Sequence, residues 1–343
     1  MLERSRELLA IDLTEIDVRK GVLGTIAVVV AVVVISLAGL VGETAGLAVL
    51  FVLVADSPGT TRERFTNVLT VTVAGSVIAF VAVWVGTDSA PAAALLTFTI
   101  TALATLASGR DPTVASRALI LSIWAILALS FSGDMKTALE LALAFMMGGV
   151  IATVVLWFEP RSGSAESIEG TADATLRSFE ELIRSPLAVI AVVRASAVAV
   201  GTALGIVWYP EHPVWPALTV LLVMANKPGE AIGAGLLRAF GTLMGVAAAE
   251  VVVEVAGGSE AVMLIAFFVS AYAMFAFKHV AYWVYVLFLT SVLVLMQALV
   301  GADAGATATD RLTATLLGAA IAIVGISIGW VIAAPEDRLP SAD

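Results

Sequence analysis

The stretch TVLLVMANKPGEAIGAGLLRAFGTLMG (219–245) places a Pro-Gly turn, an arginine and a Gly-Thr-x-x-Gly run between two apolar flanks. A fainter copy, VLFVLVADSPGTTRERFTNVLTVTVAG, occupies residues 49–75. A shift of 170 residues aligns positions with special backbone or packing roles: Pro58 with Pro228, Gly59 with Gly229, Thr72 with Thr242, Gly75 with Gly245, and Gly148 with Gly318. Because Pro fixes φ and Gly tolerates positive φ, the spacing predicts a turn at the same place in two halves of the chain.

The composition indicates a membrane protein with many spans. Of the 343 residues 60% are hydrophobic and 13% are charged, and the mean hydropathy is +1.03. Stretches longer than the roughly 18 residues needed to cross a bilayer lie at 21–42, 65–87, 89–109, 279–302 and 312–335. Backbone polar groups in hydrocarbon must be satisfied within their own segment, so these spans are helices and the predicted fold class is all-α.

The apolar segments predict about twelve helices in two sets of six. The first set is 21–41, 44–56, 66–86, 90–108, 116–132 and 138–158, and the second is 187–208, 213–226, 236–257, 260–277, 279–299 and 312–333. The predicted organisation is a cytoplasmic N-terminal segment (1–20), a first six-helix membrane repeat (21–158), a cytoplasmic linker (159–186), a second repeat (187–334) and a cytoplasmic tail (335–343).

The linker favours one short helix. Leu176, Phe179, Leu182 and Ile183 fall on one helical face, which is typical of an amphipathic helix lying on the membrane surface. The alternative is a linker helix that serves only as a spacer.

An even number of spans per half returns each half to its starting face. The two repeats should therefore be parallel and related by a pseudo-twofold axis along the membrane normal. The second helix of each half, 44–55 and 213–226, is short, at about 18 to 21 Å against a hydrocarbon core of about 30 Å. Such segments at equivalent positions mark transporter binding sites. Ordinary spans completed by residues beyond the flanking charges are the alternative.

Basic residues fix the orientation, since Lys and Arg are retained on the cytoplasmic side. With both termini inside, all 18 bases except Lys136 and Arg311 fall on the inner side. We therefore expect a multi-pass protein of the cell membrane with cytoplasmic N- and C-termini.

Several classes of function are excluded or disfavoured. There is no cysteine, and His212 and His279 are too few and too separated for a metal site. The net charge of −10 disfavours a nucleic-acid partner. We find no phosphate-binding loop, no nucleophile-base arrangement and no His-Glu-x-x-His run, so we expect no enzyme activity, no cofactor and no metal. The expected partners are the lipid bilayer and a small organic anion, and self-association into a homo-oligomer stays open.

One group of residues resembles the signature of a known family: Trp215, Thr219, Pro228, Gly229, Arg238, Gly241, Thr242 and Gly245. It is similar to that of the FUSC family, the fusaric acid resistance protein-like membrane proteins, which include aromatic acid exporters and are related to the aluminium-activated malate transporters. The resemblance extends over about 210–335. In the first half Ala45, Val68 and Val71 replace Trp215, Arg238 and Gly241. The resemblance implies export or passive conduction of small organic anions.

The residues themselves suggest where an anion would bind. Arg238, Lys227 and the helix N-terminus after Pro228-Gly229 could form a cytoplasmic vestibule for a carboxylate. The alternative for Arg238 is snorkelling to the headgroups. The remaining candidates for the pathway are Thr242, Lys278, Arg62, Arg64, Arg110 and Trp215.

Two further sets have roles of their own. Small residues that let helices approach closely are Gly241, Gly245, Gly75, Gly148 and Gly318. Glu250 and Glu254 could couple transport to protons, or they simply face the outer water. The sequence thus predicts an exporter of small organic, for example aromatic, acid anions, with a passive anion channel of the malate-channel type as the alternative.

Overall fold

The computed structural model describes residues 12–39, 42–55, 61–86, 88–109, 112–131, 133–157, 179–224, 231–278, 280–299 and 304–332. These residues form helices and no strand, which confirms the all-α prediction. The first half contains α2 (Val18–Leu37), α3 (Gly42–Ala55), α4 (Thr61–Val85), α5 (Ala90–Ser108), α6 (Pro112–Ala128) and α7 (Met135–Trp157). After α8 (Phe179–Ile183) come α9 (Pro186–Trp208), α10 (Trp215–Val223), α11 (Ala231–Ala256), α12 (Glu260–Ala276), α13 (Tyr282–Leu299) and α14 (Ala304–Ile332).

Local sequence signals set several of these helix ends. Asp17 caps α2, accepting a hydrogen bond from the Lys20 backbone N–H at 2.9 Å. Proline occupies the first turn of α5, α9 and α10, where its missing N–H costs nothing. Gly257 and Gly258 have φ of 54° and 86° and form the turn between α11 and α12. That turn needs the left-handed region that glycine enters without strain.

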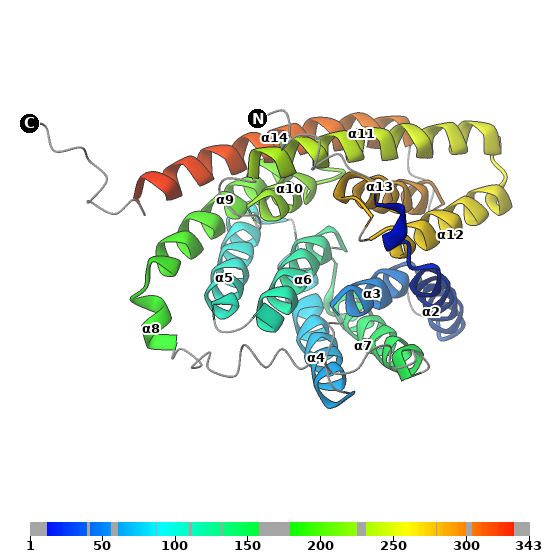
Figure 1. Ribbon diagram of the computed structural model, residues 1–343, viewed down its shortest axis with the longest axis horizontal. Helices are drawn as coiled ribbons and strands as arrows, with labels where there is room; N and C mark the ends of the chain where they lie inside the picture. Colours follow the sequence, from blue (N-terminus) through cyan, green and yellow to red (C-terminus); the bar gives the residue numbers. More distant parts are fainter. Residues whose placement is uncertain are drawn as a thin grey trace, which may run out of the picture.

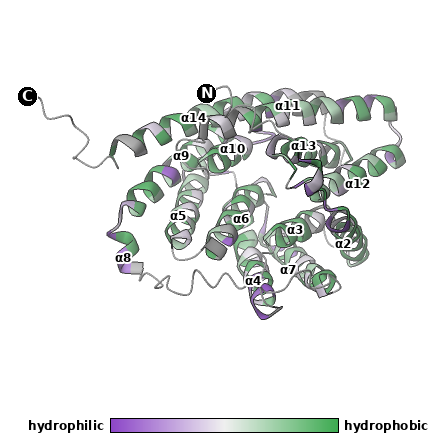
Figure 2. Cartoon of the chain, viewed as in Figure 1, coloured by the Kyte–Doolittle hydropathy of each residue, from purple (hydrophilic) through white to green (hydrophobic). Residues whose placement is uncertain are grey.

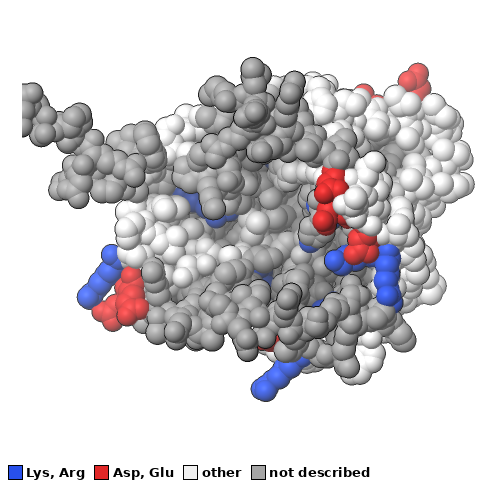
Figure 3. Space-filling view, in the orientation of Figure 1, with Lys and Arg blue, Asp and Glu red and all other residues white. Residues whose placement is uncertain are grey.

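Seven of the helices are long and apolar enough to cross a membrane: α2, α4, α5, α7, α9, α11 and α14. Large apolar side chains are exposed at helical spacing, as Leu139, Leu143, Met146, Val150 and Val154 are on α7. Figure 2 shows apolar residues along many helices, and the charged side chains of the described residues occupy only a few places on the face seen in Figure 3. In water this surface would aggregate. The chain is therefore a multi-pass membrane protein, although the predicted count of twelve spans is not confirmed.

The two short helices are short in the structure as well. α3 has 14 residues and α10 has nine, giving about 21 Å and 14 Å of helix. Neither is among the candidate spans. α10 packs against α9 and α14, and α3 against α2 and α7, so both are enclosed by longer helices. The Pro58-Gly59 and Pro228-Gly229 turns that follow them lie outside the described residues.

The two predicted halves are interlocked rather than merely adjacent. α5 of the first half packs along α9 of the second, and α12 of the second half packs along α2 of the first (Figure 1). Thr97 and Thr202 share a hydrogen bond of 3.1 Å between α5 and α9. The Asp17 N–H donates to the Ala276 carbonyl at 3.0 Å, which ties the start of α2 to the end of α12. Each half thus supplies a helix that the other half buries.

The linker helix differs from its prediction. α8 contains only five residues, and Leu176 lies outside the described part of the chain. Leu182 is fully buried whereas Ile183 is 51% exposed. A Cβ at Gly109 would lie 3.0 Å from a Leu182 methyl group, which places α8 against the end of α5. Leu182 thus packs onto the helix bundle, while the amphipathic helix on the membrane surface stays a prediction, because the side chains of Leu176 and Phe179 lie outside the described part of the chain.

Candidate functional site

Two arginines are buried inside the second half of the chain. Arg238 on α11 is 6% exposed and Arg311 on α14 is 5% exposed. Figure 1 shows α11 and α14 side by side along one edge of the molecule, and the charge of Arg238 acts on Arg311. Within the described residues, Arg238 Nε and Arg311 Nε and Nη1 have no hydrogen-bond partner. We call Arg238 and Arg311 the arginine pair.

Close helix contacts hold the arginine pair in place. A Cβ at Gly241 would lie 2.5 Å from the Trp283 carbonyl oxygen, and one at Gly245 would overlap the Leu287 carbonyl. The Ser291 hydroxyl donates to the Gly245 carbonyl at 3.0 Å, which reinforces the contact between α11 and α13. A Cβ at Gly318 would lie 2.5 Å from the Pro216 carbonyl oxygen. Glycine at these positions lets α11 approach α13 and lets α14 approach α10.

Aromatic rings lie near the arginine pair. Arg311 Cζ lies 4.7 Å from the centroid of the Trp215 ring, within cation-π range. The His212 ring is stacked on Trp215 with centroids 4.1 Å apart and an interplanar angle of 3°. Tyr285 on α13 is close enough to feel the charge of Arg238. The site therefore offers flat apolar faces next to its charges.

His212 lies between α9 and α10, outside the candidate spans. Burial is the main cause that lowers its pKa, and the positive charge of Arg311 lowers it further. Asp310 and Glu211 act in the opposite direction without cancelling these effects. At neutral pH the imidazole is consequently uncharged, and it adds a ring rather than a third positive charge to the site.

Buried like charges are costly. Each guanidinium loses hydration on burial, and an unpaired buried N–H costs about 1 to 3 kcal/mol. A carboxylate would relieve both costs, because its two oxygens accept hydrogen bonds from guanidinium groups and its charge offsets the repulsion. The arrangement is suited to holding an anion, and a planar body attached to that anion could lie against the aromatic rings.

The structure brings some of the predicted pathway residues together. Trp215, Arg238 and Thr242 lie in this region, and Thr242 is 2% exposed one turn beyond Arg238 on α11. The Arg238 side chain is buried rather than exposed at a helix end, which is not the arrangement that snorkelling requires.

Other predicted pathway residues lie elsewhere or are not described. Lys278 donates to the Val54 carbonyl at 3.4 Å, at the end of α3. Arg62 and Arg64 lie at the start of α4, on the opposite side of the molecule from α11 (Figure 1). They do not join the arginine pair, so the single basic ring expected around Arg238 is not formed by the described residues. Lys227, Pro228, Gly229 and Arg110 lie outside those residues.

Arg311 requires a correction. The helix predicted over 312–333 begins at Ala304 in the structure, so Arg311 is buried two turns into α14 instead of preceding it, and its assignment to the outer side of the membrane stays a prediction. The antiparallel contact of α11 and α14 brings it near Arg238. An arginine within an apolar span is itself a signal of a functional site, and that signal was available in the sequence.

The acidic pair lies far from the arginine pair along α11. Glu250 and Glu254 are twelve and sixteen residues beyond Arg238, or about 18 and 24 Å along the helix axis. Glu250 is half-buried and Glu254 is exposed. Proton coupling through these carboxylates stays a prediction, and they do not contact the arginine pair directly. Within the described ranges, no group of three His, Asp or Glu side chains could hold a metal ion.

The first half has its own close contact at the positions expected for helix packing. A Cβ at Gly75 on α4 would overlap the Phe145 ring of α7, and Gly148 is buried in α7. The Trp124 indole N–H donates to the Gly75 carbonyl at 2.9 Å. At this place the first half thus has aromatic packing instead of buried charge.

A comparison with protein families places this site in a known group. Residues 196–325 match the family described as fusaric acid resistance protein-like, a segment that includes Trp215, Arg238, Tyr285 and Arg311. This match confirms the FUSC resemblance. FUSC proteins are a membrane transporter family, and residues 196–325 of this chain are similar to them. The first half of the chain lies outside the match. No curated protein and no solved structure matches the chain.

Proposed function

We propose that the protein exports small organic acid anions from the cytoplasm and that aromatic carboxylates are its substrates. The observation that carries this proposal is the arginine pair: both buried guanidinium groups have unpaired N–H groups, and Arg311 lies over the Trp215 ring. The carboxylate binds Arg238 and Arg311, and the ring of the substrate packs against the aromatic side chains.

Export of an anion needs no nucleotide. A membrane potential of 100 mV, negative inside, drives each exported negative charge with about 2.3 kcal/mol. The arginine pair lowers the cost of taking the carboxylate out of water, because the charges that replace its hydration shell are already in place. The potential then supplies the direction of net movement.

In the proposed organisation, the repeats 21–158 and 187–334 are related by a pseudo-twofold axis along the membrane normal, and both termini are cytoplasmic. Equivalent helices make equivalent contacts. The contact of α3 with α7 corresponds to that of α10 with α14, and the contact of α4 with α6 corresponds to that of α11 with α13. The contact of α5 with α9 likewise corresponds to that of α12 with α2. The Gly75 carbonyl accepts a hydrogen bond from the Trp124 indole on α6, and the Gly245 carbonyl accepts one from the Ser291 hydroxyl on α13. These correspondences support the repeat.

The proposal is tested by flux in proteoliposomes. Proteoliposomes that contain the wild-type chain are loaded with benzoate, phenylacetate or malate. Efflux of the acid is then measured with and without an imposed membrane potential. We expect Arg311→Gln and Arg238→Gln to reduce efflux of the aromatic acids at least tenfold. Arg184→Gln is the matched control, because Arg184 is exposed and pairs with Glu180 at 2.8 Å on α8. If no acid moves, or if Arg311→Gln behaves like the control, the exporter proposal is wrong.

A channel is the second candidate, and one observation favours it. The exchange of α5 and α12 between the halves restricts rocking of one half against the other, and such rocking is the usual basis of alternating access. A channel would use the same arginine pair in a fixed pathway. Unitary current steps in a planar bilayer, well above the turnover of a carrier, would identify the channel, and their absence together with substrate counterflow would identify the exporter.

A further inference from the structure

A third arginine, Arg194, is half-buried and lies apart from the arginine pair. Arg194 on α9 donates from Nη2 to the Leu221 carbonyl of α10 at 3.2 Å, and its Nε has no hydrogen-bond partner within the described residues. Leu221 is in the last turn of α10, where carbonyls lack helical partners and the helix dipole is negative. This contact compensates only part of the guanidinium charge, because a helix terminus supplies about half an elementary charge.

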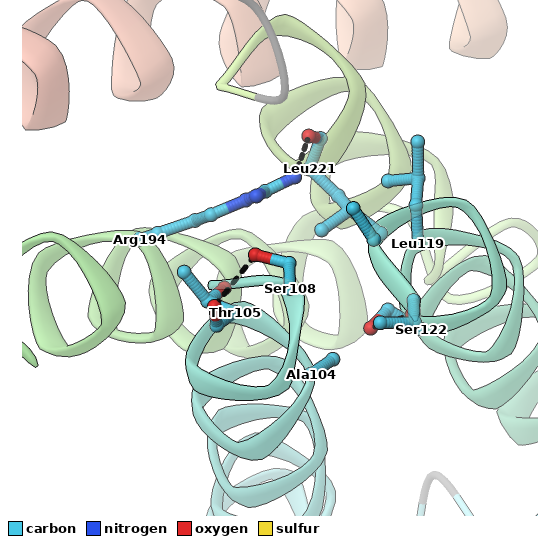
Figure 4. Close-up of a pocket in the computed structure, with 9 residues that line it drawn as sticks. Ala104, Thr105, Ser108, Leu119, Ser122, Arg194 and Leu221 are labelled. Carbon is cyan, nitrogen blue, oxygen red and sulfur yellow. Dashed lines mark hydrogen bonds between the residues drawn. The ribbon is translucent and has the colours of Figure 1, made fainter. Parts of the chain in front are cut away.

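A cavity of about 20 Å³ adjoins the Arg194 side chain. Figure 4 shows the side chain of Arg194 extending along this cavity toward Leu221, with Thr105, Ser108 and Ser122 on the facing helices. Thr105 and Ser108 come from α5 and Ser122 comes from α6, so both halves of the chain form the walls. The described residues that line it include three hydroxyl groups and no carboxylate.

The lining hydroxyls can serve as hydrogen-bond donors. Ser122 Oγ donates to the Ala118 carbonyl at 2.8 Å, and Ser108 Oγ donates to the Thr105 carbonyl at 2.7 Å. The Ala118 carbonyl lies inside α6, so the Ser122 hydroxyl can rotate toward the cavity and give up only a secondary bond, whereas the Thr105 carbonyl lies in the last turn of α5. The cavity therefore combines one full positive charge with hydroxyl groups able to donate.

Size decides which anion the cavity can take. A single water requires about 10 to 15 Å³ measured in this way. The cavity of about 20 Å³ is therefore large enough for one small particle, such as a water molecule or a monatomic ion. We propose that this cavity binds a single chloride ion, held by Arg194 Nε and the hydroxyls of α5 and α6, at a site separate from the transport site.

Chloride at this position would join four helices. It would contact α5 and α6 of the first half and, through Arg194, the end of the short helix α10. An ion that binds only the folded chain stabilises it in proportion to its occupancy. The site is therefore a structural anion site between the halves, and its occupancy does not depend on whether the arginine pair transports organic acids.

Thermal unfolding of the full purified chain in detergent tests the proposal. Sodium chloride is titrated against sodium gluconate at constant ionic strength. We expect a saturable rise in the unfolding temperature for the wild-type chain and at least a tenfold weaker chloride response for Arg194→Gln. Arg184→Gln and Arg311→Gln should keep the full response, since neither residue lines the cavity.

The outcomes separate this site from the transport site. If the wild-type chain does not respond to chloride, or if Arg311→Gln rather than Arg194→Gln removes the response, the proposal is wrong. Should Arg194→Gln fail to fold, crystals of the wild-type chain grown in bromide decide the matter by anomalous scattering. A bromide peak beside Arg194 Nε supports the site, and a water molecule alone in the cavity overturns it.

Discussion

Replacement of Gly318 by alanine should disturb the arginine pair without removing any charge. A Cβ at this position of α14 would lie 2.5 Å from the Pro216 carbonyl oxygen and 2.7 Å from Thr219 Cβ. Ordinary contact begins near 3.4 Å, so α14 and α10 must separate by about 0.9 Å, the difference between these distances. Backbone atoms of α10 cannot give way as a flexible side chain can.

The separation has a cost in stability and a cost in binding. Overpacking of this kind typically destabilises a protein by about 1 to 3 kcal/mol. Arg311 lies two turns before Gly318 on the same helix and sits over Trp215 at the start of α10. A shift of α14 away from α10 would therefore weaken the contact between Arg311 and Trp215. If the shift costs about 1.4 kcal/mol of substrate contacts, affinity falls about tenfold.

Gly329→Ala is the matched control, because it lies on the same helix and makes the same chemical change. A Cβ at Gly329 would lie 3.7 Å from a Val193 methyl group, which is ordinary contact. Both variants gain the higher helix propensity of alanine. Unfolding temperature in detergent and aromatic acid flux in proteoliposomes are measured for both. If Gly318→Ala unfolds at the same temperature as Gly329→Ala and transports equally well, the packing that we assign to α10 and α14 is wrong.

Further predictions concern individual contacts. Because burial lowers the His212 pKa, the unfolded chain binds a proton at higher pH than the folded chain, so the free energy of unfolding should decrease as pH falls below about 6.5. His212→Gln should flatten this decrease in a pH series of thermal unfolding. A series that is the same for the variant and the wild type would contradict the lowered pKa of His212. Trp215→Ala should reduce flux of benzoate more than flux of malate, with Trp215→Phe in between, and equal losses for both acids would argue against stacking. Thr202→Val should destabilise the contact of α5 with α9 by about 0.6 kcal/mol in thermal unfolding, while Thr313→Val on an exposed face should not.

The positions of the helices follow from hydropathy and turn chemistry. Apolar runs, capping residues such as Asp17 and prolines such as Pro186 and Pro216 place most helices within a few residues of where they are found, but α14 begins at Ala304 and not at the predicted residue 312. The short length of α10 can also be predicted from the sequence, because Pro213 and Pro216 limit where the helix can begin. These signals are local, and lipid enforces them because each span must satisfy its own backbone.

The pairing of helices does not follow from such local signals. The buried face of α5 is a row of small residues, Ala93, Thr97, Thr101 and Thr105, which favours close packing but does not say which helix packs there. That partner is α9, from the other half. Likewise, the charge bias of the loops assigns Arg311 to one face of the membrane, whereas its location depends on how α14 lies against α11.

The arginine pair is tested most directly by a double-mutant cycle on substrate affinity. The affinity of benzoate for the purified chain is measured by calorimetry for the wild type, Arg238→Gln, Arg311→Gln and the double variant. If both guanidinium groups hold one carboxylate, the single variants each lose at least tenfold, and the double variant loses clearly less than the product of the two losses. Losses that multiply, or single variants that bind like the wild type, would contradict a shared anion site.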